Sequence, residues 1–377
     1  MKTLRTVVFL LVGGVFFISS AFAQLPRTLP KTAVPSTRTV RGLKDTVGFA
    51  ISAAQMNLTV QLSRQADSLM LAKNAKKYRL TPGSFFVAGI SPHDDFIYAG
   101  PVYAHLYPYL KATRVVILGV SHYARRWHVE NTLVFDAFKK WRGPYGLVRV
   151  SALRKEILTK LPKSDFIVSS PMQAEEHSVE ALIPWLQYYN RKVEIVSILV
   201  PYMSWPKLDS LSQDLAAVLA RLIQTHHWQL GRDIAFLISN DCSHYGDQGW
   251  GGRNFAPFGV GCEGLKRGTQ RDRNIARQTL CGSLTRFKVH DFYTRVLNPL
   301  DYHQYKVTWC GRFAVPFGTN MLAHLMKNLH RKPLVGDFLR YGDSVELGEL
   351  NVRHTGMGVT APANLHHWVG YVAIGYR

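Results

Sequence analysis

The sequence predicts an α/β fold with a central, mostly parallel β-sheet flanked by helices on both faces. Continuous apolar runs rich in β-branched residues are typical of strands buried on both sides, and helical patterns alternate with these runs. The predicted strands are residues 85–91, 114–121, 193–200, 233–240 and 368–376. The predicted helices are residues 101–111, 151–161, 178–189, 208–225 and 318–330.

The N-terminus has the composition of a cleavable secretory signal. Residues 1–23 start with two basic side chains, continue through an apolar stretch at 7–17 and end in Ala21-Phe22-Ala23. This stretch is shorter than the roughly 20 residues of a membrane-spanning helix. We therefore expect export to the periplasm or the extracellular space, with no stable membrane anchor after cleavage.

Composition divides the rest of the chain into two parts. Residues 24–47 are rich in Pro, Thr and Arg without apolar periodicity, which predicts an extended N-terminal arm. Residues 48–377 begin with a helical pattern and continue into the strand–helix alternation, which predicts a single α/β domain with a sizeable core.

The chain is strongly basic, with a formal net charge of +21. The basic residues fall in separate segments, which favours solvated faces over a dedicated polyanion groove; these segments include Arg125-Arg126, Lys139-Lys140, Lys266-Arg267 and the trio Arg271, Arg273 and Arg277. Nucleic acid is seldom met outside the cytoplasm, so we expect a small-molecule or peptide partner instead. The sequence does not indicate an oligomeric state.

Four cysteines in an exported chain allow up to two disulfides. Cys262 with Cys281 is the favoured pair, because both flank an Arg-rich segment that a cross-link would order. Buried free thiols are the alternative.

Histidines follow three of the predicted strands. His93 comes after residues 85–91, His122 after 114–121, and His244 after 233–240, with Asp241 three residues before it. In a parallel α/β sheet, loops at the carboxyl ends of the strands converge and form ligand sites. The sequence therefore predicts a histidine pocket at this edge of the sheet.

A fourth histidine belongs to the segment 173–185. The pattern predicts a helix with Glu175, Glu176 and His177 in its first turns, where the helix dipole favours carboxylates. Glu180 lies three residues after His177 and hence on the same predicted face, so that one side chain could orient or titrate the other.

These segments carry a resemblance to a known family. The motifs run in order from about residue 85 to 317: "PHDDFIYAGPVYAHLY", "ILGVSH", "GPYG", "EEHSVEALIPWL", "SNDCSHYG" and "WCGRFAV". Together they resemble the MEMO family, known in bacteria as AmmeMemoRadiSam system protein B. The resemblance implies a fold similar to that of class III extradiol dioxygenases, which hold non-haem iron between two histidines and a carboxylate.

The resemblance also implies roles for individual residues. His93 and His122 match the two family histidines expected to bind a metal, and His177 matches the dioxygenases' acid/base residue, with Glu176 and Glu180 beside it. The cofactor implied is a divalent transition metal, with Fe(II) favoured and Cu or Zn as alternatives.

The third metal ligand is left open by the sequence. In animal relatives a Cys of the last histidine motif contributes, and Ser243 stands at its matching position, with Cys242 one residue away. A one-residue shift in an extended segment turns the side chain to the opposite face. Asp94 and Asp95 replace the small residues of the first motif, and either would complete a two-His-one-carboxylate site.

Two functions follow from this pocket. The first is a metal-dependent oxidoreductase similar to non-haem iron dioxygenases. The alternative is a metal- or ligand-binding module without turnover, which recognises a peptide or a small anionic ligand that Arg125-Arg126 could neutralise. In either case the ligand would contact side chains next to the motifs, of which we expect Tyr98, Tyr123, Asp241 and His244.

Overall fold

The computed structural model describes residues 33–247 and 254–377. The predicted signal at 1–23 and the first part of the predicted arm lie outside the described residues. Residues 32–377 form one compact unit. None of the described helices is both long and apolar enough to cross a membrane.

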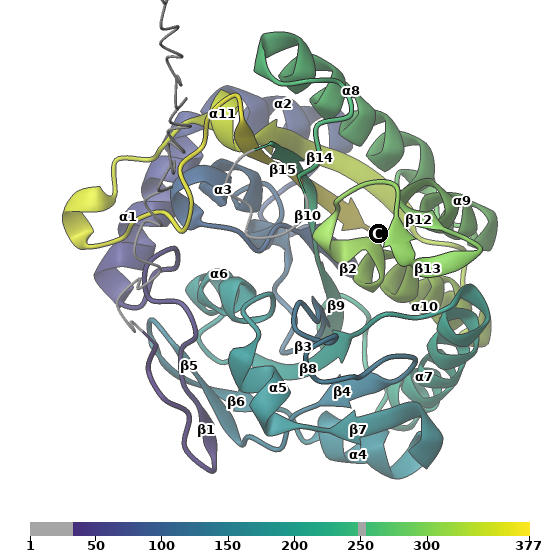
Figure 1. Cartoon of the computed structure of the whole chain (residues 1–377). Helices are drawn as coiled ribbons and strands as arrows, with labels where there is room; N and C mark the ends of the chain where they lie inside the picture. The colour runs from purple at the N-terminus through teal and green to yellow at the C-terminus, as the bar shows by residue number, and fades with distance from the viewer. Residues whose placement is uncertain (1–32, 248–253) are drawn as a thin grey trace, which may run out of the picture. The chain divides into compact units, whose positions relative to one another are not determined.

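A large sheet forms the centre of this unit (Figure 1). Its parallel centre has the order β6-β8-β3-β9-β2, and the edge next to β2 is antiparallel, in the order β15-β14-β11. The bounds are β2 Ala88–Ser91, β3 Arg114–Val120, β6 Gly146–Val150, β8 Glu194–Val200, β9 Ile234–Ser239, β11 Gly282–Ser283, β14 Val335–Asp343 and β15 His367–Tyr376. The predicted fold class is confirmed.

Shorter strands extend the sheet. β10 (Asp241–Gly246) pairs with β15, β4 (Leu133–Phe135) pairs with β7 (Phe166–Val168) and β8, and β5 (Lys140–Gly143) joins β6 to β1 (Val40–Arg41). A separate two-stranded ribbon consists of β12 (Leu297–Asn298) and β13 (Asp301–Tyr305).

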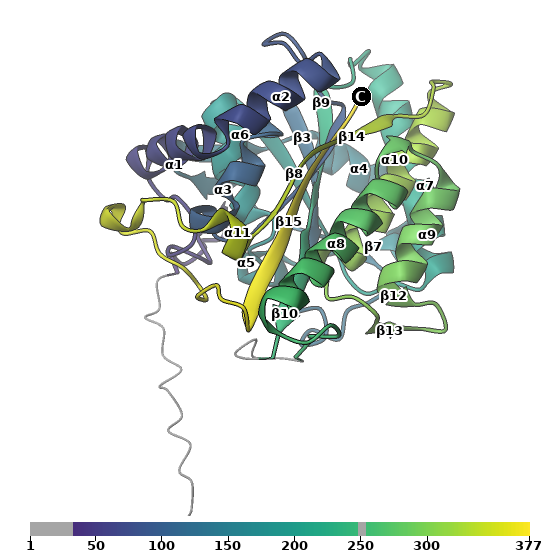
Figure 2. The same cartoon turned by 90° about the horizontal axis from the view of Figure 1, so that it is seen from above.

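Helices cover both faces of the sheet, as Figure 2 shows. One layer contains α1 Ala53–Ala66, α2 Ser68–Tyr78, α3 Phe96–Tyr103, α5 Ser170–Glu175 and α6 Ile183–Tyr189. The other contains α4 Leu153–Lys160, α7 Trp205–Thr225, α8 Gly261–Thr279, α9 Arg286–Val296 and α10 Ala314–Asn328. The short helix α11 (Ser344–Leu347) follows β14.

Each face of the sheet has its own hydrophobic core, and β3 contributes to both. Val116 and Leu118 belong to the core under α7 and α10, whereas Val115 and Ile117 belong to the core under α3 and α6. Successive side chains of a strand point to opposite faces. A strand between two helical layers is therefore apolar at every position, which explains the uninterrupted apolar runs.

Two predicted helices differ from the structure. α3 begins at Phe96 and not at residue 101, and runs through Pro101. The predicted helix at 178–189 is broken into a 3-10 turn (Glu180–Leu182) and α6, so Glu176 and His177 lie in a connection after α5 and not in a first helical turn. The Glu176 carboxylate accepts the backbone N–H groups of His177 and Ser178, which stabilises this extended path.

The disulfide prediction is wrong, because all four cysteines are free. Cys262 lies in the first turn of α8 and Cys281 follows the end of the same 19-residue helix. A helix of this length separates its ends by about 28 Å, whereas a disulfide requires Cα atoms within about 7 Å. The Arg-rich segment between the two cysteines is ordered by helix formation instead.

The described part of the predicted arm packs on the domain. β1 adds a parallel strand beside β5, and the Arg41 side chain is 1% exposed. Its guanidinium forms an ion pair with Glu180 and donates to the carbonyl oxygen of Glu176. The segment before residue 48 thereby supports the connection that carries Glu176 and His177.

Candidate metal centre

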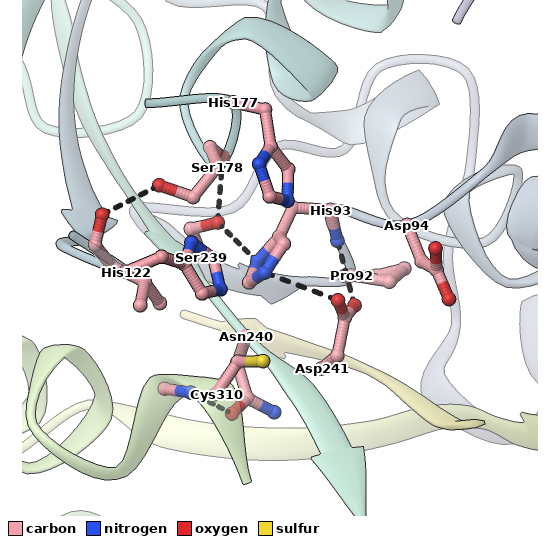
Figure 3. A network of polar contacts seen from close by, with 12 residues as sticks. Pro92, His93, Asp94, His122, His177, Ser178, Ser239, Asn240, Asp241 and Cys310 are labelled. Atoms are coloured by element: carbon pink, nitrogen blue, oxygen red, sulfur yellow. Dashed lines mark hydrogen bonds and ion pairs between the residues drawn. The ribbon is translucent and has the colours of Figure 1, made fainter. Parts of the chain in front are cut away.

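The predicted histidines do converge at the carboxyl edge of the parallel strands: Figure 3 shows His93, His122 and His177 together, and His244 lines the same pocket. They line a pocket of about 430 Å³. Its described lining is His93, Asp94, Asp95, Tyr98, His122, His177, Asp241, His244, Cys310, Ser344, Thr360, Ala361, Pro362, Ala363, His367, Val369 and Tyr371. No Lys or Arg occurs in this described lining.

His93 is held in one tautomer by Ser239. The Ser239 hydroxyl donates its single proton to the carbonyl oxygen of Ser178 at 2.7 Å, so it can only accept from Nδ1–H of His93 at 2.8 Å. Nε2 of His93 therefore carries a lone pair. This atom is buried and makes no hydrogen bond within the described residues, although Asp241 Oδ2 lies 3.1 Å away. Burial lowers the pKa of His93 well below its ordinary value, which keeps the ring neutral.

Glu176 holds the second histidine. Its Oε1 lies 2.8 Å from Nδ1 of His122, and its Oε2 accepts the backbone N–H of His122. Burial alone would raise the pKa of the Glu176 carboxyl, but His122 lowers it to about 2, so Glu176 is ionised and accepts from Nδ1–H. Nε2 of His122 is then the atom left to bind a metal. Carboxylate–imidazole pairs of this kind orient metal-binding histidines in many proteins.

Cys310 lies beside these two histidines and is the third potential metal ligand. Ligand atoms of His93, His122 and Cys310 all lie within 4.8 Å of one another. Cys310 begins a 3-10 turn, Cys310–Arg312, which is fixed because the backbone N–H of Gly311 donates to the Asn240 side chain at 3.1 Å. A Cβ at Gly311 would lie 2.4 Å from Asn240 Oδ1, so glycine is required for this approach. The sequence prediction did not include Cys310 among the candidate ligands, although this residue is the Cys of the "WCGRFAV" motif.

The residues expected as the third ligand face elsewhere. Ser243 donates its hydroxyl to Asp272 at 2.7 Å, and Cys242 is fully buried in the core on the α7 and α10 side. β10 places Asp241 and His244 in the pocket and turns both intervening residues away. The sequence prediction therefore needs correction: the thiol that lies beside His93 and His122 is that of Cys310, on a different loop.

Asp94 and Asp95 line the pocket without joining the ligand group. Asp94 Oδ2 accepts from the Tyr371 hydroxyl at 2.8 Å, and Asp95 Oδ2 accepts from the backbone N–H and hydroxyl of Thr360. Neither carboxylate belongs to any of the three potential metal-ligand groups found among the described residues. Burial raises the pKa of both carboxyls, and that of Asp241 as well.

His177 and His244 form the two other ligand groups. His177 groups with His122 and Glu176, and its ring stacks on that of His122 with centroids 4.7 Å apart. His244 groups with Asp241 and Cys310, and its Nε2 lies 3.0 Å from the Cys310 sulfur. Burial lowers the pKa of both His177 and His244 below the ordinary value, so both rings are neutral near pH 7.

Of the remaining predicted residues, one lines the pocket and two lie outside its described lining. Tyr98 lines the pocket and donates to Glu349 at 3.1 Å. Tyr123 lies outside the described lining, where Arg126 stacks over its ring. Glu180 faces away from the pocket, because it pairs with Arg41 and accepts the backbone N–H groups of Lys44 and Asp45.

The fold and the group of two imidazoles and a thiol define an α/β protein with a potential transition-metal site at the carboxyl edge of its parallel strands. The family model for "Memo-like protein" matches residues 55–349, and the chain belongs to this family. The resemblance seen in the sequence motifs is thereby confirmed.

Individual relatives agree with this assignment. The chain is 33% identical to a MEMO1 family protein of Pyrobaculum arsenaticum over 170 residues, which are 43% of this chain and 55% of the relative. It is also 33% identical to MEMO1 family proteins of Metallosphaera sedula and Saccharolobus solfataricus, over 161 and 165 residues, in each case 41% of this chain and 52% of the relative. The chain thus spans about half the length of these relatives.

Proposed function

We propose that the pocket is a divalent metal centre in which His93, His122 and Cys310 are the ligands, and that the protein is a metal-dependent oxidoreductase acting on a small molecule. The observation that carries the proposal is the pair of fixed Nδ1–H groups. Ser239 and Glu176 accept these two N–H groups, so Nε2 of each ring is the atom left to bind a metal beside the Cys310 thiol, and the metal displaces the second proton of His122.

The donor set bears on the identity of the metal. Fe(II) was favoured on the expectation of a carboxylate as third ligand, whereas the ligand group contains a thiol. Thiolate and imidazole together suit copper or zinc, and the two-His-one-carboxylate set suits Fe(II). We therefore propose copper or zinc ahead of iron, with copper required for electron transfer to or from the bound molecule.

His177 is suited to move a proton in this pocket. Its pKa is lowered, so near pH 7 the ring is neutral and can accept a proton. Nδ1 of His177 lies 3.8 Å from Glu176 Oε1, and the negative charge of Glu176 would stabilise the protonated ring. A group that remains 32% exposed can also exchange protons with solvent. These contacts support a role as acid/base residue.

The experiment measures bound copper and zinc in purified wild type and in the variants His93→Ala, His122→Ala and Cys310→Ala. We expect each variant to lose most of the metal. Cys262→Ala and His226→Ala are matched controls with the same substitutions at exposed or half-exposed positions away from the pocket, and they should keep it. Equal metal content in all six proteins would contradict the proposal.

A binding module without turnover is the second candidate. It is supported by the position of His244 and Asp241, which offer further ligand atoms next to Cys310. A metal with four protein ligands has no open position for a substrate, as in structural zinc sites. The anionic-ligand form of this idea lacks support, because Arg125 stacks on Tyr202 and Arg126 on Tyr123, outside the described pocket lining. Consumption of dioxygen or of another oxidant by the metal-loaded protein distinguishes turnover from binding alone.

Export is part of the proposal and rests on residues 1–23, with their basic start, apolar stretch and small-residue end. Expression of the full chain and N-terminal sequencing of the mature protein test it. We expect the mature chain to begin at Gln24 in the periplasmic or culture fraction. An unprocessed N-terminus in the cytoplasmic fraction would contradict export.

A further inference from the structure

The second feature of this molecule that suggests a ligand is a basic groove between α8 and α9. Its volume is about 840 Å³, within the range of small-molecule sites. The described lining contains no acidic residue and five basic ones, which are Lys266, Arg267, Arg271, Arg295 and Lys306. We call it the α8–α9 groove. It shares no residue with the described lining of the metal pocket.

One face of α8 forms the first wall of this groove. Lys266, Gln270, Asn274 and Gln278 recur every four residues and thus form one ridge, and Arg267, Arg271 and Ile275 form the ridge beside it. This wall presents cations and amide donors over an apolar floor that includes Ile275, which is 5% exposed.

The opposite wall supplies two more cations. Arg295 comes from α9, which packs against α8, and Lys306 follows β13 (Figures 1 and 2). Asp291 pairs with Arg295 at 2.9 Å, so this cation is partly neutralised, and Arg295 also donates to the Gln278 side chain of α8. A ligand that contacts the cations of both walls would have to carry more than one negatively charged group.

Among the described residues, none of the other four cations forms an ion pair with a carboxylate, although Asp272 attracts Arg271 and is linked to it through Ser243. The undescribed segments contain no Asp or Glu, so they cannot supply a hidden carboxylate. Arg271 is held in place by Phe255 and Phe258, over whose rings it lies, and it donates to Ser243. Its Nε is buried and makes no hydrogen bond within the described residues. Clustered cations repel one another, and a bound anion would relieve this repulsion.

We infer that the α8–α9 groove binds a small anion with two or more phosphate groups. Guanidinium groups bind phosphate through paired hydrogen bonds, and lysines bind it as point charges. A tetrahedral phosphate has oxygen acceptors in several directions, so that one group can accept donors from both walls, whereas a planar carboxylate has fewer. Lys266, Arg267 and Arg271 are close in sequence on α8, and the fold adds Arg295 and Lys306 from other segments.

Titration calorimetry of the mature chain with tripolyphosphate at low salt tests this inference. We expect binding that weakens as salt is added, and binding of inorganic phosphate about tenfold weaker or more, since fewer charge-assisted hydrogen bonds form. Absence of tripolyphosphate binding at low salt would overturn the inference. Citrate binding as tightly as tripolyphosphate would overturn the assignment to phosphate.

Matched variants separate a site from a general charge effect. Arg267→Gln with Lys306→Gln removes two cations from the groove, and we expect about tenfold weaker binding or more. Lys155→Gln with Lys160→Gln removes two exposed cations from α4, away from α8 in Figures 1 and 2, and should leave the affinity within about twofold. Equal weakening by both double variants would overturn the inference.

A third variant guards against misfolding as an explanation. Asn274→Glu places a carboxylate in the groove at an exposed helical position that tolerates substitution. We expect it to weaken tripolyphosphate binding while the unfolding midpoint and the metal content stay unchanged. Unaltered affinity in this folded variant would overturn the inference and leave the metal centre untouched.

Discussion

Glu176 contacts His122 with both carboxylate oxygens, one at the ring and one at the backbone: Oε1 lies 2.8 Å from Nδ1 and Oε2 accepts the backbone N–H at 2.7 Å. A single carboxylate thus fixes both the rotation of the ring and its tautomer. The same carboxylate also accepts the amides of His177 and Ser178. The connection after α5 and the end of β3 are consequently held together at this proposed metal ligand.

The first prediction concerns this contact. Glu176→Gln replaces an ionised acceptor with a neutral amide, which weakens the orientation of His122 and the basicity of its Nε2. We expect metal affinity to fall by about 10–100-fold, the usual cost of losing such a partner. Competition with a chelator measures it. Glu175→Gln is the control, because Glu175 contacts Arg126 and Trp127 at the surface. The same loss in both variants would refute a special role for Glu176.

The second prediction tests the tautomer of His93. Ser239→Ala removes the acceptor of Nδ1–H and lets the proton move to Nε2, where it would block a metal. We expect metal affinity to fall by about tenfold or more. Ser178→Ala is the control: its hydroxyl donates to Val120 and does not touch a histidine, while its carbonyl oxygen remains. Isothermal titration with zinc gives both affinities. Unchanged affinity in Ser239→Ala would show that the tautomer is set by other contacts.

The third prediction concerns pH. Burial alone would lower the pKa of His122, but Glu176 and Cys310 raise it well above the ordinary value, and burial raises the pKa of the Cys310 thiol. Near pH 7 the metal-free protein therefore holds a proton on each of these ligands, and metal binding must displace both. We expect release of about two protons per metal, and an affinity that rises with pH until these groups are deprotonated.

Titration with zinc in buffers of different ionisation enthalpy measures this proton release. Cys310→Ser should reduce it to about one proton, since a serine hydroxyl keeps its hydrogen, while Cys262→Ser should leave it at about two. Release near zero in the wild type would mean that the ligands are already deprotonated in the metal-free protein.

The sequence predicted those parts of the fold that depend on local patterning. The central strands are apolar at every position because each is covered on both faces, and this pattern is visible without tertiary information. Histidines directly after β2 and β3 could be placed in one pocket because parallel strands end at a common edge. The helix at 178–189 was predicted less well, since its start depends on the hydrogen bonds of Glu176 to backbone amides.

The third ligand could not be derived from spacing. Cys310 follows His122 by nearly half the chain, and contacts that spacing does not reveal, those of Thr308 with His244 and of Gly311 with Asn240, bring its loop to the end of β9. The prediction at Ser243 and Cys242 assumed that the ligand lay on the same strand as His244. The register of β10 against β15 shifts between Asp241 and His244, and this irregularity lets both of these side chains line the pocket while the two between them point elsewhere, which regular alternation along a strand would not allow.

The last prediction concerns Glu180, which the sequence placed beside His177 and the structure places against Arg41. Both side chains of this ion pair are nearly inaccessible, at 1% and 3% exposure. Glu180→Ala leaves the guanidinium buried without its counter-charge, and we expect a loss of about 3–5 kcal/mol in the free energy of unfolding. Urea denaturation measures it. Glu156→Ala breaks a half-exposed pair with His226 and should cost at most about 1 kcal/mol.

The folded fraction of Glu180→Ala should keep the metal affinity of the wild type, because Glu180 does not contact a proposed metal ligand. An unchanged free energy of unfolding with loss of turnover would instead assign Glu180 to the chemistry.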